Sequence, residues 1–172
     1  MPAVFRDWRD GRKVKAASAA DPGLALFQRF GGCALLDPFG VTAVDEAMAQ
    51  VTTYSVAEVQ AKFADPQVQI VDIRDVRELE REGTVPGALL APRGMLEFWV
   101  DPASPYFKPV FGDEGKQFIL FCGAGWRSAL AAKTLQDMGM TNVAHIDGGY
   151  AEWVKQGAPT ETLEERKARV SG

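Results

Sequence analysis

The sequence predicts an α/β fold in which an open, mostly parallel sheet is covered by helices on both faces. From about residue 51 onward, short apolar and β-branched runs alternate with segments of helical period. Residues 118–121 are apolar throughout, which is typical of a strand that is buried on both faces. Strands that alternate with helices form a parallel sheet, because each helix returns the chain to the same edge.

The expected strands are short and bounded by polar or turn-forming residues. They cover residues 51–54, 68–73, 88–90, 118–121 and 143–146. In an open parallel sheet, ligands bind in the crevice beyond the carboxyl ends of the strands. Residues that directly follow a strand are therefore the first candidates for a functional site.

The helices between these strands have recognisable starts and ends. Ser55 and Glu58 have the spacing of a capping box that opens a helix to about residue 63. Asp75 and Glu78 repeat this spacing, and the helix that they open is expected to end at Gly83. The two later helices carry apolar residues at helical spacing and end at a glycine: Ala131, Leu135 and Met138 before Gly139, and Tyr150, Trp153 and Val154 before Gly157.

The chain divides into three segments. Residues 1–43 have no sustained period and predict an N-terminal extension that is at most partly ordered, with a short helix near residues 24–30. Residues 44–160 form the predicted domain, in which residues 94–111 are a connection rich in aromatic residues and proline. Residues 161–172 predict a charged helix or a solvated end.

Composition excludes several classes of protein. The 172 residues are 47% hydrophobic and 24% charged, as in a globular protein rather than a disordered chain. A formal charge of −4 disfavours nucleic-acid binding, which needs a clustered basic surface. No apolar run approaches the length of a membrane helix, and the N-terminus lacks the apolar stretch of a secretory signal. We therefore expect no nucleic-acid or membrane partner and a cytoplasmic location.

Cysteine and histidine are scarce. Cys33 and Cys122 are the only cysteines and His145 is the only histidine, so neither a disulfide framework nor a zinc site is expected. We expect no metal and no other cofactor. A structural role is favoured for His145, and Cys33 is expected to be an inert thiol.

Cys122 directly follows the buried strand of residues 118–121, and the next helix is expected about six residues later. The segment reads Cys122, Gly123, Ala124, Gly125, Trp126, Arg127 and Ser128. The two glycines allow backbone angles that aim loop N–H groups at one point, which forms a nest for an anion. These donors and the positive end of the next helix favour the nucleophilic thiolate.

Other interpretations exist for each of these residues. A single cysteine at a strand end is more often a small buried apolar residue, and the glycines can be ordinary turn residues. Arg127, at the start of a helix, opposes the helix dipole unless an anion lies nearby, although it can also be a surface charge. Together, after a buried strand and before a helix, these residues favour a functional thiol.

The loop has the form Cys-x-x-Gly-x-Arg-Ser, which resembles the active-site loop of the rhodanese-like family. Further motifs of that family stand in the expected order: Val71-Asp72-Ile73-Arg74, Gly83-Thr84-Val85-Pro86-Gly87-Ala88, and Asp147-Gly148-Gly149-Tyr150 followed by Trp153. The resemblance covers about residues 50–158. It implies a three-layer fold with a five-stranded, mostly parallel sheet, and a cysteine that forms a persulfide at the position of Cys122.

The resemblance also implies an activity, that of a sulfurtransferase. Cys122 would accept a sulfane sulfur from a thiosulfonate, thiosulfate or a small persulfide, and pass it to a thiol, to cyanide or to a protein. Two positions depart from the family pattern. Thr84 stands where many members have histidine, and Ala124 stands where the well-known thiosulfate-using enzymes have lysine. The second departure puts efficient use of thiosulfate in question.

Several residues outside the loop are candidates for supporting roles. Arg127 and Arg93 would orient an anionic donor. Asp72 either positions the loop or pairs with an arginine such as Arg77, and the alternative is a simple cap at the end of its strand. Trp126 either forms a wall of the pocket or covers the core.

Three other functions remain open. A phosphatase or arsenate reductase of the same fold places its arginine six positions after the cysteine, whereas Arg127 lies five positions after Cys122. A non-catalytic binding module of this fold commonly lacks the cysteine or the loop glycines, which this chain has. A redox sensor would use Cys122 for oxidation, and it would accumulate sulfenic acid rather than persulfide.

Overall fold

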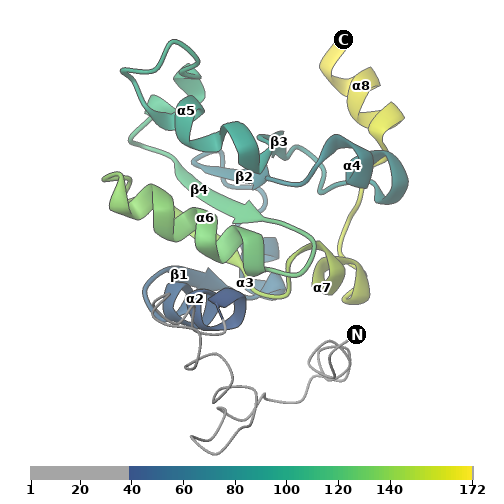
Figure 1. Ribbon diagram of the computed structural model, residues 1–172. Coiled ribbons are helices and arrows are strands. Elements are labelled where there is room, and N and C mark those ends of the chain that lie inside the picture. The colour runs from purple at the N-terminus through teal and green to yellow at the C-terminus, as the bar shows by residue number, and fades with distance from the viewer. Residues whose placement is uncertain (1–38, 172) are drawn as a thin grey trace, which may run out of the picture. The chain divides into compact units, whose positions relative to one another are not determined.

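The computed structural model describes residues 39–171, and Figure 1 shows them as a ribbon coloured by residue number. Most of the expected N-terminal extension, including the helix near residues 24–30 and Cys33, lies outside the described residues. None of the helices among residues 39–171 is long and apolar enough to cross a membrane.

A five-stranded sheet forms the centre of the described structure. Its strands are β1 (Thr52–Tyr54), β2 (Val68–Asp72), β3 (Leu89–Leu90), β4 (Gln117–Phe121) and β5 (Val143–Ile146). They are arranged in the order β1-β5-β4-β2-β3, and every neighbouring pair is parallel. The sheet and the helices around it confirm the predicted fold class.

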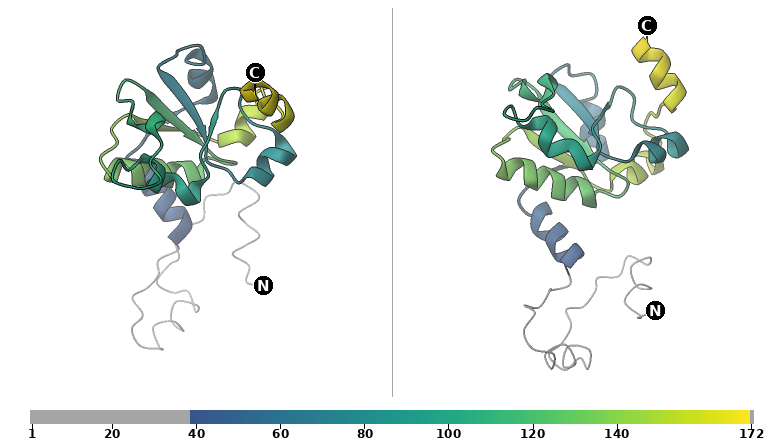
Figure 2. Two further views of the ribbon diagram at one scale, coloured as in Figure 1. Left: turned by 90° about the horizontal axis from the view of Figure 1, so that it is seen from above. Right: turned by 45° about the horizontal axis from the view of Figure 1, so that its top comes forward.

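Helices connect the strands and cover both faces of the sheet (Figure 2). The α-helices are α2 (Phe39–Met48), α3 (Val56–Ala61), α4 (Val76–Glu82), α5 (Leu96–Val100), α6 (Trp126–Asp137), α7 (Gly149–Lys155) and α8 (Leu163–Ser171). Two short 3₁₀ helices, η3 (Arg93–Met95) and η4 (Pro109–Gly112), flank α5.

The alternation of side chains along β4 divides the core into two layers. Phe118 and Leu120 belong to one cluster, which includes residues of α5 and α6, whereas Ile119 and Phe121 belong to another, which includes residues of α3 and α7. All four side chains are fully buried. The continuous apolar run therefore reflects a central strand with a core on each face.

Two of the predicted helix starts are present with the expected hydrogen bonds. Ser55 caps α3 and Asp75 caps α4, and in each case a glutamate three residues later completes the capping box. Gly83 ends α4, and β5 has the predicted bounds. These features are set by neighbouring residues in the sequence.

Other expectations differ from the structure. The boundary expected between residues 43 and 44 falls inside α2, a helix whose Val44 and Ala47 pack toward α6. Its sequence contains Gly and β-branched residues, so helical propensity does not reveal it, and tertiary packing stabilises it. The connection of residues 94–111 contains α5 and most of two 3₁₀ helices. Its Trp99 and Phe111 pack on the core, whereas Phe98 and Tyr106 are exposed.

Two side chains expected on buried helix faces are exposed. Val154 is 50% exposed, because only Tyr150 and Trp153 of α7 turn toward the sheet. Met138 is 46% exposed, because α6 ends at Asp137 and Met138 is its cap. The start of α6 at Trp126 is also two residues earlier than expected.

The charged C-terminal segment is a helix that is attached to the domain. Glu161 and Thr84 exchange backbone hydrogen bonds of 2.8 Å and form an isolated antiparallel bridge. The Glu161 side chain also pairs with Arg169 of α8 at 2.9 Å. This bridge brings the start of the segment beside the turn that follows α4.

Candidate active site

Cys122 lies directly after the central strand β4, at the carboxyl edge of the sheet. Its side chain is 1% exposed. Within the loop, Ala124, Trp126 and Arg127 are exposed, whereas Cys122 and Ser128 are buried. The loop therefore holds the sulfur on its inner side and presents Trp126 and Arg127 to the surface.

Helix α7 holds this loop through its first backbone amides. Tyr150 donates its N–H to the carbonyl of Cys122 at 2.7 Å, and Ala151 donates to the carbonyl of Gly123 at 2.9 Å. A Cβ at Gly149 would lie 2.4 Å from the Cys122 carbonyl oxygen, and the φ of Gly149 is +57°. The contact between the loop and α7 therefore requires a glycine at position 149.

Gly125 serves the same close contact from the other side. It has a φ of +87°, and a Cβ there would lie 3.0 Å from the backbone nitrogen of Gly148. Because the carbonyl groups of Cys122 and Gly123 are turned toward α7, the loop directs these oxygens away from an anion on the sulfur.

One buried polar side chain contacts the sulfur, and a second contacts the first. The Ser128 hydroxyl oxygen lies 3.7 Å from Sγ of Cys122 and 2.9 Å from the carbonyl oxygen of Gly125. Nδ1 of His145, on β5, lies 3.5 Å from the same hydroxyl. The residue pattern identified Ser128 as part of the loop, but gave no sign that the only histidine lies behind it.

Arg127 is paired with a carboxylate that the sequence identified only as a helix cap. Its two terminal nitrogens lie 2.7 and 2.8 Å from the two carboxylate oxygens of Glu78. The Glu78 carboxylate, with a smaller contribution from Cys122, raises the pKa of Arg127, and Arg127 lowers the pKa of Glu78. The pair lies over the loop, since a Cβ at Gly123 would be 3.3 Å from Arg127 Nη2.

The partner of Glu78 follows from the sheet order. Strands β2 and β4 are neighbours, so the first turns of α4 and α6 lie beside each other at the same edge. Glu78 lies in the first turn of α4 and Arg127 in the first turn of α6. Glu78 could not be identified from the sequence as the partner of Arg127, because the sequence does not give the order of the strands.

Asp72 does pair with an arginine, but that arginine is Arg74 and not Arg77. Both side chains are buried, and the Arg74 guanidinium contacts the two carboxylate oxygens of Asp72 at 2.8–3.2 Å. Residues two apart at a strand end point to the same side, which explains this choice. Arg77 is 81% exposed and pairs with Asp75.

Further contacts fix the Asp72–Arg74 pair. Thr84, which replaces the histidine of many family members, donates its hydroxyl to Asp72 at 2.7 Å. Arg74 donates to the carbonyl of Gly83 at 2.7 Å and stacks 4.0 Å from the centre of the Tyr150 ring. Because Tyr150 belongs to α7, this cluster connects the end of β2 to the helix that holds the loop.

Arg93 forms an ion pair with Glu97, four residues later. Its backbone N–H donates to the carbonyl of Ile73 at 3.1 Å, so it lies beside the end of β2. The guanidinium groups of Arg93 and Arg77 are thus held by carboxylates near them in the sequence, and the structure does not pair either with the loop.

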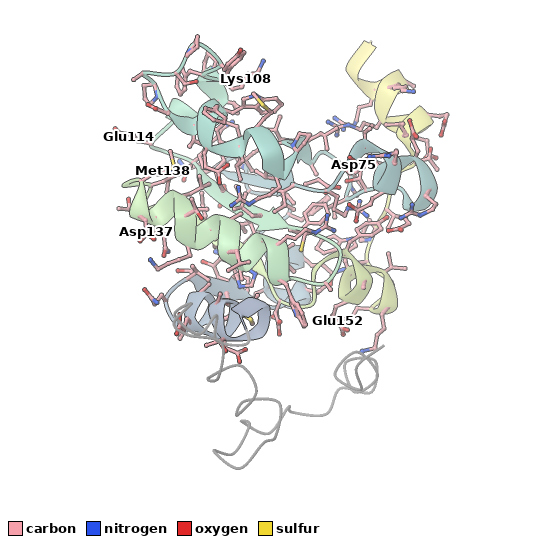
Figure 3. The ribbon with its side chains drawn as sticks, viewed as in Figure 1. Asp75, Lys108, Glu114, Asp137, Met138 and Glu152 are labelled. Atoms are coloured by element: carbon pink, nitrogen blue, oxygen red, sulfur yellow. The ribbon has the colours of Figure 1, made fainter. Side chains whose placement is uncertain are left out.

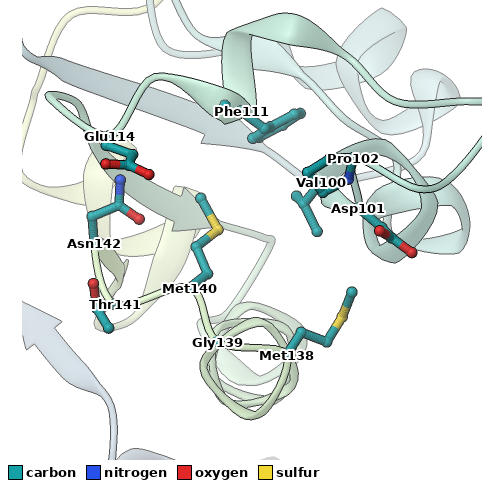
Figure 4. Close-up of a pocket in the computed structure, with 11 residues that line it drawn as sticks. Val100, Asp101, Pro102, Phe111, Glu114, Met138, Gly139, Met140, Thr141 and Asn142 are labelled. Carbon is teal, nitrogen blue, oxygen red and sulfur yellow. The ribbon is translucent and has the colours of Figure 1, made fainter.

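A groove of about 820 Å³ lies near the ends at which β4 and β5 begin, away from the loop. It is lined by the end of α5, η4 and the turn after α6 (Figure 4). Figure 3 shows Glu114 and Met138, which line it, at the opposite end of the structure from Asp75 at the start of α4. No residue of the loop from Cys122 to Ser128 lines this groove. The candidate active site is therefore the loop itself.

The fold and the loop can be compared with known proteins. The family model described as Rhodanese-like domain matches residues 55–156. Human thiosulfate:glutathione sulfurtransferase is 28% identical over 63% of this chain and 98% of its own length. A tRNA uridine(34) hydroxylase of Erwinia tasmaniensis is 31% identical over 68% of this chain, which spans only 33% of that protein.

Solved structures show the same fold. A protein of Rhodopseudomonas palustris, described as a possible tyrosine phosphatase, is 50% identical with a TM-score of 0.67 over 69% of this chain and 91% of its own. A rhodanese-related protein of Thermoplasma volcanium is 22% identical, with a TM-score of 0.52 over 64% of this chain and 97% of its own. With the loop and the five-stranded parallel sheet, these matches show that the chain belongs to the rhodanese-like domain family.

Proposed function

We propose that this protein is a sulfurtransferase that carries sulfur as a persulfide on Cys122. The observation that supports this most is the position of the cysteine. Its sulfur lies at the carboxyl end of the central strand, before the first turn of α6 and 3.7 Å from the Ser128 hydroxyl. A hydroxyl donor and a helix N-terminus both stabilise an anionic sulfur.

The first step is attack by the Cys122 thiolate on the sulfane sulfur of a donor. With a thiosulfonate, a new S–S bond forms at Cys122, the bond to the sulfonyl sulfur breaks, and a sulfinate leaves. With an alkyl persulfide, the outer sulfur is transferred and a thiolate leaves. In both cases Cys122 is left as a persulfide anion, next to the Ser128 hydroxyl.

The second step returns the enzyme to its starting state. A nucleophilic acceptor attacks the outer sulfur, the S–S bond at Cys122 breaks, and Cys122 leaves as a thiolate. Cyanide is the acceptor suited to an assay, and a thiol or a protein thiol is the acceptor we propose in the cell. The relative from human, named for thiosulfate and glutathione, supports a thiol in this role. A persistent free thiol requires a reducing compartment, so we place this reaction in the cytoplasm.

A phosphatase is the competing function, because the relative from Rhodopseudomonas palustris carries that description. Two observations favour sulfur transfer. Arg127 lies five positions after Cys122, one fewer than in the phosphatases of this fold. Its guanidinium is also held by both oxygens of Glu78, whereas a phosphate ester needs that fork for its own oxygens.

Intact-mass measurement tests the proposal. Wild-type protein incubated with thiosulfate or a thiosulfonate should gain about 32 mass units, the mass of one sulfur atom. Cyanide should remove this mass and release thiocyanate, and the Cys122→Ser variant should gain nothing. Hydrolysis of an aryl phosphate by the wild type, without sulfur uptake from any donor, would instead support the phosphatase.

A further inference from the structure

A row of polar side chains leads from the sulfur of Cys122 to the edge of the sheet. The Ser128 hydroxyl lies between Sγ of Cys122 and Nδ1 of His145, at 3.7 and 3.5 Å. On the other side of the ring, Nε2 of His145 lies 3.0 Å from the hydroxyl oxygen of Thr53, on the edge strand β1. Ser128 and His145 are fully buried, whereas Thr53 is exposed.

The distances around Thr53 indicate which ring nitrogen of His145 carries the proton. The Thr53 hydroxyl has two acceptors within reach: Nε2 of His145 at 3.0 Å and the carbonyl of Val51 at 3.4 Å. We take the shorter contact as the donated one, which leaves Nε2 unprotonated and puts the proton of the neutral ring on Nδ1, facing Ser128. The opposite tautomer requires Thr53 to donate along the longer contact to Val51 and to accept an N–H from Nε2.

Burial keeps the ring neutral. Removal from water lowers the pKa of His145 below its ordinary value of 6.5, and the nearby Asp147 and a backbone hydrogen bond at Ile146 only partly offset this effect. Asp147 follows β5, and Cys122 follows the neighbouring strand β4. Among the described residues, Asp147 is the charged group that acts on the ring, the hydroxyls of Ser128 and Thr53 and the backbone of Ile146 are its uncharged contacts, and Cys122 lies beyond Ser128.

The single proton of the Ser128 hydroxyl has two acceptors once His145 is a donor. One is the carbonyl of Gly125 at 2.9 Å, and the other is the sulfur of Cys122. The Gly125 carbonyl also accepts the backbone N–H of Ala129 at 3.0 Å, so it keeps a hydrogen bond when Ser128 turns away. Rotation of the hydroxyl toward an anionic sulfur therefore leaves no buried polar group unpaired.

We propose that His145 is a positioning residue, whose Nδ1–H donates to Ser128 and so leaves the serine proton for the anionic sulfur of Cys122. A histidine with the opposite tautomer would accept that proton and withdraw it from the sulfur. The role in persulfide stabilisation rests on the proposed sulfur transfer, but the effect on the Cys122 thiolate does not. The structure thus assigns a role to the only histidine of the chain beyond filling the core.

Two substitutions of His145 distinguish its role as a hydrogen-bond donor from its role in packing. Leucine fills the space without a donor, whereas the side-chain amide of asparagine places an N–H near the position of Nδ1. We expect His145→Leu to slow alkylation of Cys122 by iodoacetamide at neutral pH by about three- to tenfold, from the loss of one hydrogen bond that orients the Ser128 hydroxyl toward the anionic sulfur. In His145→Leu, the pH dependence of this alkylation rate should move toward higher pH. His145→Asn should restore both the rate at neutral pH and its pH dependence.

A double-mutant cycle with Ser128→Ala decides between positioning and packing. If His145 acts through Ser128, His145→Leu should change the alkylation rate of the Ser128→Ala protein by less than twofold. Equal effects of His145→Leu with and without Ser128, or an unchanged pH profile in the single variant, would overturn the inference. The alkylated peptide containing Cys122 is quantified by mass spectrometry, which excludes a contribution from Cys33. Because alkylation needs no sulfur donor, failure of the sulfurtransferase proposal would be seen separately, as a lack of sulfur uptake by the wild type.

Discussion

At the scale of single residues, the carboxylate of Glu78 neutralises Arg127, the only cation in the loop from Cys122 to Ser128. Ala124 adds no charge to this loop. Arg93, beside the end of β2, is likewise paired with Glu97. A donor with two negative charges therefore meets little uncompensated positive charge, and we expect a monoanionic donor to be used more readily.

Glu78→Gln tests this electrostatic argument. The amide keeps a hydrogen bond to Arg127 and can still cap α4, but it leaves the guanidinium charge free for a donor. We expect kcat/KM for thiosulfate to rise by about tenfold relative to methanethiosulfonate, because the dianion gains more from one unit of charge at close range. The measurement compares sulfur transfer to cyanide from the two donors.

Glu80→Gln is the matched control for this prediction. Glu80 is exposed on the same helix and has the same charge, and Arg127 is paired with Glu78 instead. The control variant should leave the ratio of the two donors within about twofold of the wild type, since exposed charges are strongly screened. An equal change in both variants would mean that net charge, and not the Glu78–Arg127 pair, sets the donor preference.

The buried pair of Asp72 and Arg74 supports a prediction of stability. Asp72→Asn leaves the buried Arg74 guanidinium with one carboxylate partner, that of the exposed Glu82 at 3.2 Å. We expect a loss of about 3 kcal/mol in free energy of unfolding, at the lower end of the cost of breaking a buried ion pair. Urea denaturation measures the change. Asp75→Asn removes an exposed carboxylate that pairs with Arg77, and it should have a much smaller effect. Similar losses in the two variants would contradict the assignment of Arg74 as the partner of Asp72.

At the scale of elements, the start of α7 and the cysteine loop are packed backbone against backbone. Gly149→Ala should displace the loop, because the new methyl group would lie 2.4 Å from the Cys122 carbonyl oxygen. We expect loss of sulfur uptake and a fall in the free energy of unfolding of more than about 2 kcal/mol, from a steric clash added to positive-φ strain. Both are measured on the same preparation.

Gly157→Ala separates strain from collision. Gly157 also has a positive φ, +68°, but no heavy atom lies within 4 Å of its missing Cβ. The substitution should cost about 1 kcal/mol through backbone strain alone and leave sulfur uptake intact. Retention of full uptake by Gly149→Ala would show that the loop does not depend on this contact.

The strands and helices could be predicted from the sequence to a greater extent than the contacts of the candidate active site. The strands and the helix starts at Ser55 and Asp75 were predictable, because apolar runs and capping boxes involve neighbouring residues. The place of Cys122 at the end of a central strand was predictable for the same reason. The partners of Arg127 and Ser128 were not, because Glu78 and His145 reach them only through the strand order β5-β4-β2. Helix α2 was missed because its packing on α6, and not its propensity, stabilises it.

At the scale of the whole molecule, stability should fall in two steps as the pH decreases. Burial lowers the pKa of His145 in the folded state, so the unfolded chain takes up a proton first, and stability is lost as the pH falls below about 6.5. Hydrogen bonds and ion pairs also lower the pKa of several carboxylates in the folded state, that of Asp75 to about 2, so their protonation likewise lowers stability as the pH falls. Their contribution is present above about pH 4.5 and is lost below it.

Urea unfolding at pH 7.5, 5.5 and 3.5 measures both steps. His145→Leu should remove the loss between pH 7.5 and 5.5 and keep the loss between 5.5 and 3.5. A wild-type free energy of unfolding that is constant from pH 7.5 to 5.5 would contradict a buried, neutral histidine.

The parallel order of the strands also determines when the site can form during folding. The central pair of β2 and β4 joins Val68 to Gln117, and the edge pair of β1 and β5 joins Thr53 to His145, which are 92 residues apart. Such distant partners close large loops before their contacts contribute, so sheets of this kind fold slowly. Within residues 39–171, β1 pairs with β5 alone, so it is expected to join the sheet after β5 is in place. We therefore expect amide protection in β4 to appear before that in β1, and the environment of Cys122 to become native only when Thr53 reaches His145.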